Sequence, residues 1–224
     1  YSTNYRFSGH KEEIPQFSVD GAHTKSLLKR AQSEKRNLLL SEALDILDDY
    51  GITPVRSAVG RDLEELQEKA DEMGYPVAIK IISDQITHKS DVGGVQINLR
   101  NAAALTAAYT EMMEKIGRAY PDAKLDGVLM QPMVMGGYEL ILGGRQDPQF
   151  GPVVVVGLGG VFVEIFDETA VRIAPISRRV ATEMLDSLRG AQILKGARGN
   201  MPSDIPALID ALLRISQLLV DFPE

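Results

Sequence analysis

The sequence predicts an α+β fold with two lobes. Predicted strands and helices are interleaved along the chain, and several consecutive strands lie close enough in sequence to form hairpins, which favours antiparallel pairing. The length of 224 residues suits one large domain or two small lobes that share a cleft, and it is ample for a real core. No internal repeat or low-complexity tract points to another class of fold.

Composition and charge narrow the class of protein. Apolar residues make up 44% of the chain and charged residues 25%, and the formal net charge is −7, which together indicate a soluble globular protein without broad electrostatic binding of nucleic acid. Cysteine is absent, which excludes disulfides, thiolate nucleophiles and cysteine-ligated zinc. The chain has 3 histidines. The longest apolar stretch, residues 152–166, contains glycines and a glutamate and is too short to span a bilayer. We therefore expect a cytoplasmic protein with neither a membrane nor a nucleic-acid partner.

Residues 1–36 are expected to form a connector. Residues 1–22 are polar and show neither helical nor strand periodicity, which is typical of a linker or a poorly ordered arm. Residues 24–36 have basic side chains and an apolar stripe, which predicts a connecting helix with a solvated charged face. Because the chain starts with Tyr1 inside this connector, we expect it to be part of a longer protein.

Residues 37–130 are expected to form the first lobe. Ser41 can cap a helix that ends at Gly51, and a second helix over residues 62–73 ends at Gly74. The apolar pattern further predicts strands at residues 52–55, 75–82, 94–99 and 127–131 and a helix at residues 102–116.

Residues 131–224 are expected to form the second lobe. Short apolar runs separated by glycine and proline predict its strands, and a helical period dominates its last third. The predicted strands are residues 138–142, 153–156 and 161–166, and the predicted helices are residues 180–188 and 205–220.

The loop between the strands at 75–82 and 94–99 is the part of the chain best suited to chemistry. Glycines allow close approach of the backbone, so N–H groups in this loop could cradle a phosphate. Its candidate residues are an imidazole (His88), an ammonium (Lys89), a hydroxyl (Ser90) and a pair of glycines (Gly93 and Gly94).

Lys80 lies in the middle of the apolar strand Val-Ala-Ile-Lys-Ile-Ile. An unpaired ammonium is expensive to bury, so this side chain must find an anion or reach solvent. A bound phosphate would satisfy the first requirement, and a position on the solvated face of an edge strand would satisfy the second. The sequence leaves both interpretations open.

His88 is the histidine best placed for catalysis. It could accept a phosphoryl group or act as a general base, and it could equally be a loop histidine with a satisfied hydrogen bond. A catalytic triad with Ser90 is disfavoured, because adjacent residues rarely reach that geometry and no strand–turn–helix motif surrounds the serine. His10 and His23 lie in the polar arm and are expected to have no chemical role.

Residues 129–139 form a second candidate region. A strand that runs into Gln131, a proline and a glycine pair resembles a hinge whose main-chain groups could pair with an adenine edge. Glu139, at the start of the next strand, could reach ribose hydroxyls or a metal, or could be a solvated carboxylate at a strand end. Farther along, residues 147–152 predict turns, and the glycines of residues 157–160 fit a hairpin as well as they fit a binding loop.

Together, these segments resemble the ATP-grasp domain of nucleoside-diphosphate-forming acyl-CoA synthetases, which include the ADP-forming acetate–CoA ligases. The resemblance covers residues 25–224 and includes the motifs HKSDxGGV, ELixGxxxDPxFGP and GLGGxxVE in that order. It implies a two-lobed ATP-grasp fold with the nucleotide site between the lobes. The matching stretches are LLLSEALDILDDYGITPV, GYPVAIKIISDQITHKSDVGGVQINL, GVLMQPMVMGGYELILGGRQDPQFGPVVVVGLGGVFVEI and ISQLLVDFPE.

The resemblance also implies a chemistry, in which phosphate passes between an acyl phosphate and a nucleotide through phosphohistidine. His88 matches the histidine that relays the phosphoryl group to or from the nucleotide in ADP-forming acetyl-CoA synthetases. Such transfer needs positioning and neutralisation of spread negative charge, which lysines can supply. The implied nucleotide-binding residues are Lys80, Lys89 and Ser90 at the phosphates, Gly93 and Gly94 in the phosphate loop, Gln131, Met133 and Val134 at the adenine hinge, and Glu139 on the ribose or metal side.

ATP or ADP and Mg²⁺ are the cofactors implied by the resemblance. The family continues past the position of Glu224 into a strand with metal-site residues, so we expect impaired Mg²⁺ binding by this chain, with Glu164 as a candidate ligand within it. The implied partners are CoA-binding and ligase domains, in the same protein or in a partner subunit, and some members add an acetyltransferase domain. This chain alone is therefore not expected to complete the conversion of acid, CoA and ATP to acyl-CoA, ADP and phosphate.

Two alternative functions stay open at this point. The chain could be a regulatory domain that senses a nucleotide or acyl-CoA inside a protein acetyltransferase. It could also belong to another ATP-grasp carboxylate ligase that uses an acyl phosphate without phosphohistidine.

Overall fold

The computed structural model describes residues 13–86, 88–160, 169–196 and 201–223. The chain divides into two compact units. Unit 1 combines Tyr1–Pro54 with Gly137–Glu224, whereas unit 2 is the continuous segment Val55–Gly136. Unit 2 is thus an insertion within unit 1.

An antiparallel sheet with the strand order β1-β4-β2-β3 forms the base of unit 2. The central strand β2 (Val77–Ile82) pairs with β3 (Val95–Leu99) on one side and with β4 (Gly127–Pro132) on the other. The short strand β1 (Ala58–Gly60) pairs with the outer side of β4. Alternate residues of β2 are buried, as the period of two in a strand requires.

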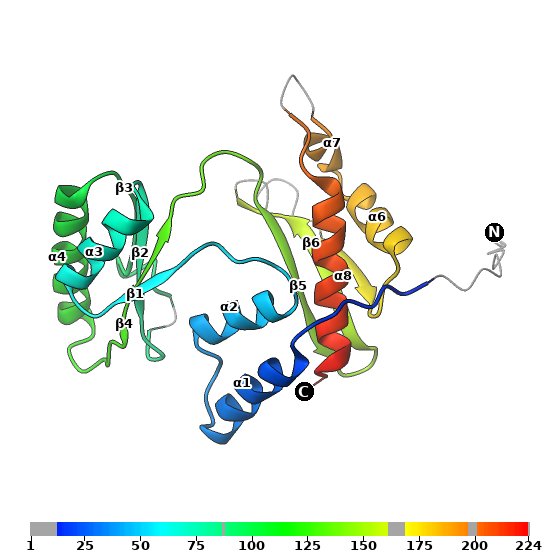
Figure 1. The fold of residues 1–224 in the computed structure, drawn as a ribbon, viewed down its shortest axis with the longest axis horizontal. Coiled ribbons are helices and arrows are strands. Elements are labelled where there is room, and N and C mark those ends of the chain that lie inside the picture. Colours follow the sequence, from blue (N-terminus) through cyan, green and yellow to red (C-terminus); the bar gives the residue numbers. More distant parts are fainter. Residues whose placement is uncertain (1–12, 87, 161–168, 197–200, 224) are drawn as a thin grey trace. The chain divides into compact units, whose positions relative to one another are not determined.

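Helices α3 (Leu63–Met73) and α4 (Ala102–Ala119) pack against this sheet and against each other (Figure 1). Their apolar stripes join Val77, Ile79 and Ile81 of β2 in one hydrophobic core. Both helices begin after a polar side chain that caps them. The Asp62 carboxylate accepts from the N–H of Glu65, and the Asn101 side chain accepts from the N–H of Ala104, each at 2.9 Å.

A second antiparallel sheet, with the strand order β5-β6-β7, forms the base of unit 1. Strands β5 (Leu140–Asp147) and β6 (Gly151–Leu158) form a hairpin, and β7 (Thr169–Ile173) pairs with β6. Leu140 pairs with Leu158 at one end of the hairpin, and Asp147 pairs with Gly151 at the other. The GLGG motif and the DPQFGP motif therefore lie at opposite ends of the hairpin.

Helix α8 (Ile205–Asp221) covers this sheet and packs its apolar side against it (Figure 1). Helix α8 packs against β5 and β6, and α6 (Arg178–Ser187) packs against β7 and α8. The short helix α7 (Ala191–Leu194) follows α6. The Ser177 hydroxyl and the Asp204 carboxylate cap α6 and α8 by accepting main-chain N–H groups.

Two further helices of unit 1, α1 (Gly21–Ser33) and α2 (Leu40–Asp49), pack on each other. A nearly buried ion pair lies at their junction: Nη1 and Nη2 of Arg36 donate to the two carboxylate oxygens of Glu42 at 2.7 and 2.8 Å. The same carboxylate accepts the N–H of Leu39 at 2.8 Å. This second bond places the start of α2 at Leu40 rather than at a cap formed by Ser41, which had been predicted.

The observed division of the chain differs from the predicted boundaries of 1–36, 37–130 and 131–224. Residues 37–54 belong to unit 1, since α2 packs on α1, and the later boundary falls at Gly136–Gly137. The predicted strand at 52–55 is absent from the described structure, because Pro54 cannot donate to a ladder and pairing with β4 begins only at Ala58. The predicted strand at 161–166 lies outside the described residues.

Candidate functional site

Lys80 projects from the middle of an interior strand. Its Cα is paired with Val95 of β3 and with Leu129 of β4, so the edge-strand interpretation is wrong. Its neighbours Ile79 and Ile81 are 1% exposed and enter the core, which places Lys80 on the opposite, partly exposed face of the sheet. Gln131 is paired with Ala78 and therefore lies on the same face as Lys80.

The first residues of the loop that follows β2 are held by hydrogen bonds and by burial. Ser83 is buried and its hydroxyl accepts the N–H of Gln85 at 3.2 Å, while Ile86 is 2% exposed within the core. The side-chain oxygen of Gln85 accepts the N–H of Lys124 at 2.7 Å. These contacts fix the base from which His88 and Lys89 project.

Gly93 and Gly94 fold the loop back rather than offer free donors. The Gly93 N–H donates to the carbonyl oxygen of Ser90 at 3.2 Å, and the Gly94 N–H donates to that of Lys89 at 2.7 Å. A Cβ on Gly94 would lie 2.8 Å from Cδ1 of Ile81 and 2.9 Å from the Lys89 oxygen, so no side chain fits there. The expected phosphate cradle therefore cannot use these two N–H groups as they stand.

Lys80 of β2 and Lys89 of the loop have no recorded carboxylate partner among the described residues. The ion pairs recorded for the described part of the chain include neither Lys80 nor Lys89. Burial, and then the positive charge of Lys80, lower the pKa of the Lys89 ammonium. Among the described residues, these two positive charges have no recorded counter-ion, so together they could attract an anion.

His88 is exposed at the start of the turn that contains Lys89 and Ser90. Its carbonyl oxygen accepts the N–H of Asp91 at 3.2 Å. Among the described residues, no side-chain hydrogen bond joins His88 to Ser90 or Asp91, so the structure gives no support to a triad. The ring is accessible to a ligand held by the neighbouring lysines.

The chain leaves the sheet directly after β4, in the region predicted to be a hinge. The N–H of Met133 donates to the carbonyl oxygen of Pro76 at 2.9 Å, which ties the first residue after β4 to the residue before β2. Val134 and Met135 are then 69% and 72% exposed, so the chain leaves the sheet at this point. Sequence reasoning missed the role of Pro76, and no local signal marks it, because the contact joins residues 57 positions apart.

Glu139 lies in unit 1, directly before β5. Its carbonyl oxygen accepts the N–H of Gly159 at 2.7 Å, and its carboxylate rests against Gly160, where a Cβ would lie 2.7 Å from Oε2. Gly160 has a φ of +57°, which favours glycine. The structure thus brings Glu139 and the glycines of the GLGG motif together, whereas Glu164 lies outside the described residues.

The DPQFGP motif occupies the opposite end of the β5–β6 hairpin. Oδ1 of Asp147 accepts the N–H groups of Gln149 and Phe150 at 3.0 and 3.1 Å, and these bonds lower the pKa of the carboxyl. The motif forms a turn, as predicted, and does not contribute to the surroundings of Glu139.

Two classes of feature are missing from the described residues. No group of three or more histidine, aspartate or glutamate side chains there could hold a metal ion by itself. Glu139 is a single carboxylate, and Mg²⁺ commonly takes one or two carboxylates together with phosphate oxygens and water. No described helix is long and apolar enough to cross a membrane.

Two small antiparallel α+β units, a lysine in the central strand of one and a glutamate beside a glycine pair in the other, are features of the ATP-grasp class of nucleotide-binding proteins. Comparison with known families supports this class, because the model of the ATP-grasp domain matches residues 29–224. The chain belongs to the ATP-grasp family, whose domain binds nucleotide and transfers phosphoryl groups.

Relatives of this chain include ADP-forming acetate–CoA ligases. It is 40% identical over 214 residues to acetate–CoA ligase (ADP-forming) I of Archaeoglobus fulgidus, which covers 96% of this chain and 31% of the relative. It is 42% identical over 203 residues to the β subunit of acetate–CoA ligase (ADP-forming) I of Pyrococcus furiosus, which covers 91% of this chain and 88% of that subunit. The chain thus spans about a third of the long relative and most of the separate subunit.

Solved structures give the same result. A structure of the dinucleotide-forming acetyl-coenzyme A synthetase 1 of Ca. Korarchaeum cryptofilum, in complex with coenzyme A, Ca-AMPCP and HgCl+, matches with a TM-score of 0.84 at 41% identity, over 89% of this chain and 87% of that chain. Another structure of that protein, with coenzyme A and Mg-AMPPCP and its phosphohistidine segment pointing towards the nucleotide-binding site, matches with a TM-score of 0.76 at 40% identity, over 90% and 87% of the two chains. The predicted fold class and family are confirmed.

Proposed function

We propose that this chain binds ATP or ADP with Mg²⁺ and transfers a phosphoryl group between the nucleotide and His88, as part of an ADP-forming acyl-CoA synthetase. The observation that carries this proposal is the exposed His88 next to Lys89, which, like Lys80, has no recorded counter-ion among the described residues. Phosphoryl transfer is mainly positioning and neutralisation of charge, and this arrangement offers both.

The lysines would hold the phosphates of the nucleotide. Strand pairing on both sides fixes the backbone of Lys80, whereas Lys89 lies in the loop after β2. With ATP, the bond between the γ-phosphorus and the bridging oxygen breaks and ADP leaves, while the unprotonated ring nitrogen of His88 bonds to phosphorus. The proton on the other ring nitrogen then passes to solvent, to which His88 is exposed. The reverse step forms ATP from ADP.

The hinge after β4 would bind the adenine. The N–H of Met133 is already bonded to Pro76, so the groups that can pair with a base edge are the carbonyl oxygen of Met133 and the main chain of Val134 and Met135. Gln131 and Ser90 would contribute side-chain contacts to the same nucleotide. This assignment keeps the predicted hinge but moves its donor beyond Met133.

Glu139 would act on the ribose or metal side. Its carboxylate can accept from ribose hydroxyls or share a Mg²⁺ ion with phosphate oxygens and water, and bound Mg²⁺ would neutralise phosphate charge. Gly159 and Gly160 leave the carboxylate room beside the main chain.

The complete reaction needs further parts. The proposed reaction is acid plus CoA plus ATP to acyl-CoA, ADP and phosphate, and CoA-binding and ligase domains would supply the acyl and CoA sites, in the same protein or in a partner subunit. The Korarchaeum relatives were observed with coenzyme A, which supports such a partner. We propose a cytoplasmic location on the basis of the enzyme family.

Labelling with [γ-³²P]ATP and Mg²⁺ tests the histidine relay. Acid-labile, base-stable label should appear on the wild-type chain and on a His23→Ala control, and should be absent from His88→Ala. Label that persists on His88→Ala, or that never forms on the wild type, contradicts the relay. A thermal shift with ADP measures nucleotide binding separately, because a ligand of the folded state raises its stability.

A further inference from the structure

The segment that precedes α1 is held by one side chain of α8. Residues 13–20 form neither helix nor strand, yet the N–H of Phe17 donates to Oε1 of Gln217 at 2.8 Å. Nε2 of Gln217 in turn donates to the carbonyl oxygen of Phe17 at 3.2 Å. Gln217 is 9% exposed and Phe17 is half-buried, so both bonds are partly shielded from water. Gln217 thus bonds both main-chain groups of Phe17, as the edge of a neighbouring strand would do. A side-chain amide of this kind can hold an extended peptide.

The Phe17 side chain has a site of its own. Its ring packs against the core of unit 1, and the guanidinium carbon of Arg214 lies 4.1 Å from the ring centroid. Arg214 is itself fixed, because Nη1 donates to the carbonyl oxygen of Tyr50 at 2.9 Å and Nη2 lies 3.6 Å from the Asp210 carboxylate. The aromatic site is therefore supported by residues outside the arm.

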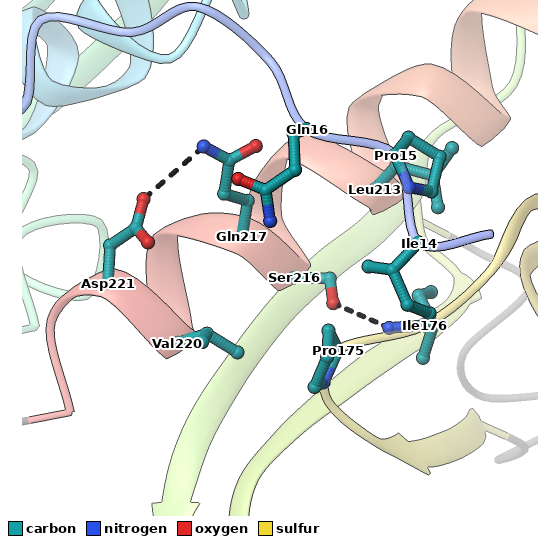
Figure 2. Close-up of a pocket in the computed structure, with 10 residues that line it drawn as sticks. All are labelled: Ile14, Pro15, Gln16, Pro175, Ile176, Leu213, Ser216, Gln217, Val220 and Asp221. Carbon is teal, nitrogen blue, oxygen red and sulfur yellow. Dashed lines mark hydrogen bonds between the residues drawn. The ribbon is translucent and has the colours of Figure 1, made fainter.

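The residues before Phe17 occupy the rest of a groove on α8, as Figure 2 shows. Ser216 is 1% exposed, and its hydroxyl accepts the N–H of Ile176 at 3.0 Å, which fixes the turn after β7 against the helix. A small cavity remains beneath the arm. Its lining residues are Ile14, Pro15 and Gln16 of the arm and Pro175, Ile176, Leu213, Ser216, Gln217, Val220 and Asp221 of the groove.

We propose that this groove on α8 is a peptide-docking site. Residues 13–20, with the sequence Glu-Ile-Pro-Gln-Phe-Ser-Val-Asp, occupy it within the chain, and it accepts the same extended sequence from a separate molecule. The contacts described above are all made by residues 14–17, and none of them requires the peptide to continue into α1. The groove therefore anchors the polypeptide before residue 21 to unit 1 by docking as well as by the covalent link. The site involves neither nucleotide nor His88, so it is independent of the proposed function.

Binding of a fluorescent peptide of residues 13–20 to the full chain tests the proposal. In the full chain with Phe17→Ala, the arm lacks its ring and leaves the groove open, so the labelled peptide should bind saturably by fluorescence anisotropy. Binding to the wild-type chain should be weaker by about tenfold or more, since a tethered arm competes at a millimolar effective concentration. A peptide that itself carries Phe17→Ala should bind neither chain.

Two variants of the receiving chain separate the groove from the rest of the surface. Adding Gln217→Ala to the Phe17→Ala chain removes both main-chain bonds and should abolish peptide binding. Adding Gln149→Ala, which changes an exposed glutamine on the β5–β6 turn, should leave peptide binding unchanged. Equal affinity for the wild-type and Phe17→Ala chains, or no binding to the Phe17→Ala chain, overturns the proposal.

Hydrogen exchange on the wild-type chain gives a measurement that needs no variant. The Phe17 amide should exchange about a hundredfold more slowly than the Gln16 and Ser18 amides, because only a bonded, buried amide needs an opening event before exchange. Equal exchange rates at the three positions would show that the arm is not docked and would also overturn the proposal.

Discussion

The N–H of Met133 is bonded to the carbonyl oxygen of Pro76, at 2.9 Å, across the start of β2 and the end of β4. This bond withdraws one main-chain donor from the hinge and leaves the exposed residues that follow it for a ligand. Hydrogen exchange should therefore distinguish three adjacent amides.

In the nucleotide-free chain, the amide of Met133 should be protected, and the amides of Val134 and Met135 should exchange rapidly. Addition of ADP should slow exchange at Val134 or Met135, because a base edge would accept from one of these donors, and should leave Met133 unchanged. Hydrogen exchange followed by NMR or by mass spectrometry measures these amide exchange rates. Rapid exchange at Met133 without nucleotide would contradict the structure, and no change with saturating ADP would contradict the proposed hinge.

Gly94→Ala tests the packing of the phosphate loop. The new Cβ would lie 2.8 Å from Cδ1 of Ile81 and 2.9 Å from the carbonyl oxygen of Lys89, so the loop must move. We expect a loss of about 1–3 kcal/mol in the free energy of unfolding, together with weaker ADP binding. Gly117→Ala is the matched control, because nothing lies within 4 Å of its Cβ position on α4, and it should be neutral or stabilising. Urea unfolding that gives both variants the same stability would contradict this packing.

Lys89→Met should separate binding from stability. The ammonium is partly buried and repelled by Lys80, so its removal should leave the free energy of unfolding unchanged or raise it. Affinity for ADP should fall by about tenfold or more, which corresponds to about 1.4 kcal/mol. Calorimetry and urea unfolding measure the two quantities. The control Lys124→Met changes a lysine that is 78% exposed and paired with Asp126, and a drop in affinity for that variant as large as for Lys89→Met would refute a specific anion site.

Glu42→Gln should reveal an acid-sensitive ion pair in unit 1. The hydrogen bonds from Arg36 lower the pKa of Glu42 to about 2, despite burial. A carboxyl with a lowered pKa in the folded state adds stability above its unfolded pKa, near 4.5, and loses it as the pH falls through the folded value. The variant should be less stable by about 2 kcal/mol at pH 7, and the difference should shrink between about pH 5 and pH 2.

Chemical denaturation at several pH values checks this expectation. Glu64→Gln, on the exposed side of α3, is the control and should follow the wild type across the range. A difference between wild type and Glu42→Gln that stays constant from pH 7 to pH 2 would show that the lost interaction is not ionic.

Local signals in the sequence predicted most of the helices. The apolar periodicity predicted α4, and the sequence placed Lys80 in a strand but left both interpretations of it open. Whether β2 was an edge or an interior strand depended on pairing with β4, which lies about 50 residues later. Patterns within a segment cannot report such pairing, and the same reason hid the bond between Pro76 and Met133.

Two further differences between the predictions and the structure have identifiable causes. The loop glycines were expected to present their N–H groups to phosphate, but the return of the chain to β3 uses those donors for bonds to Ser90 and Lys89. The arm was expected to be a linker because it lacks periodicity, yet a single aromatic residue and a buried amide are enough to dock it. Neither interaction leaves a repeating pattern in the sequence.

The insertion of unit 2 within unit 1 has a consequence for synthesis on the ribosome. Residues 55–136 are continuous and have their own core, so they can fold as soon as they emerge. Unit 1 cannot, because Phe17 meets Gln217 and Tyr50 donates to Asp221 across separations of 200 and 171 residues. Residues 17 and 50 must therefore wait for residues 217 and 221 before the unit that they belong to is complete.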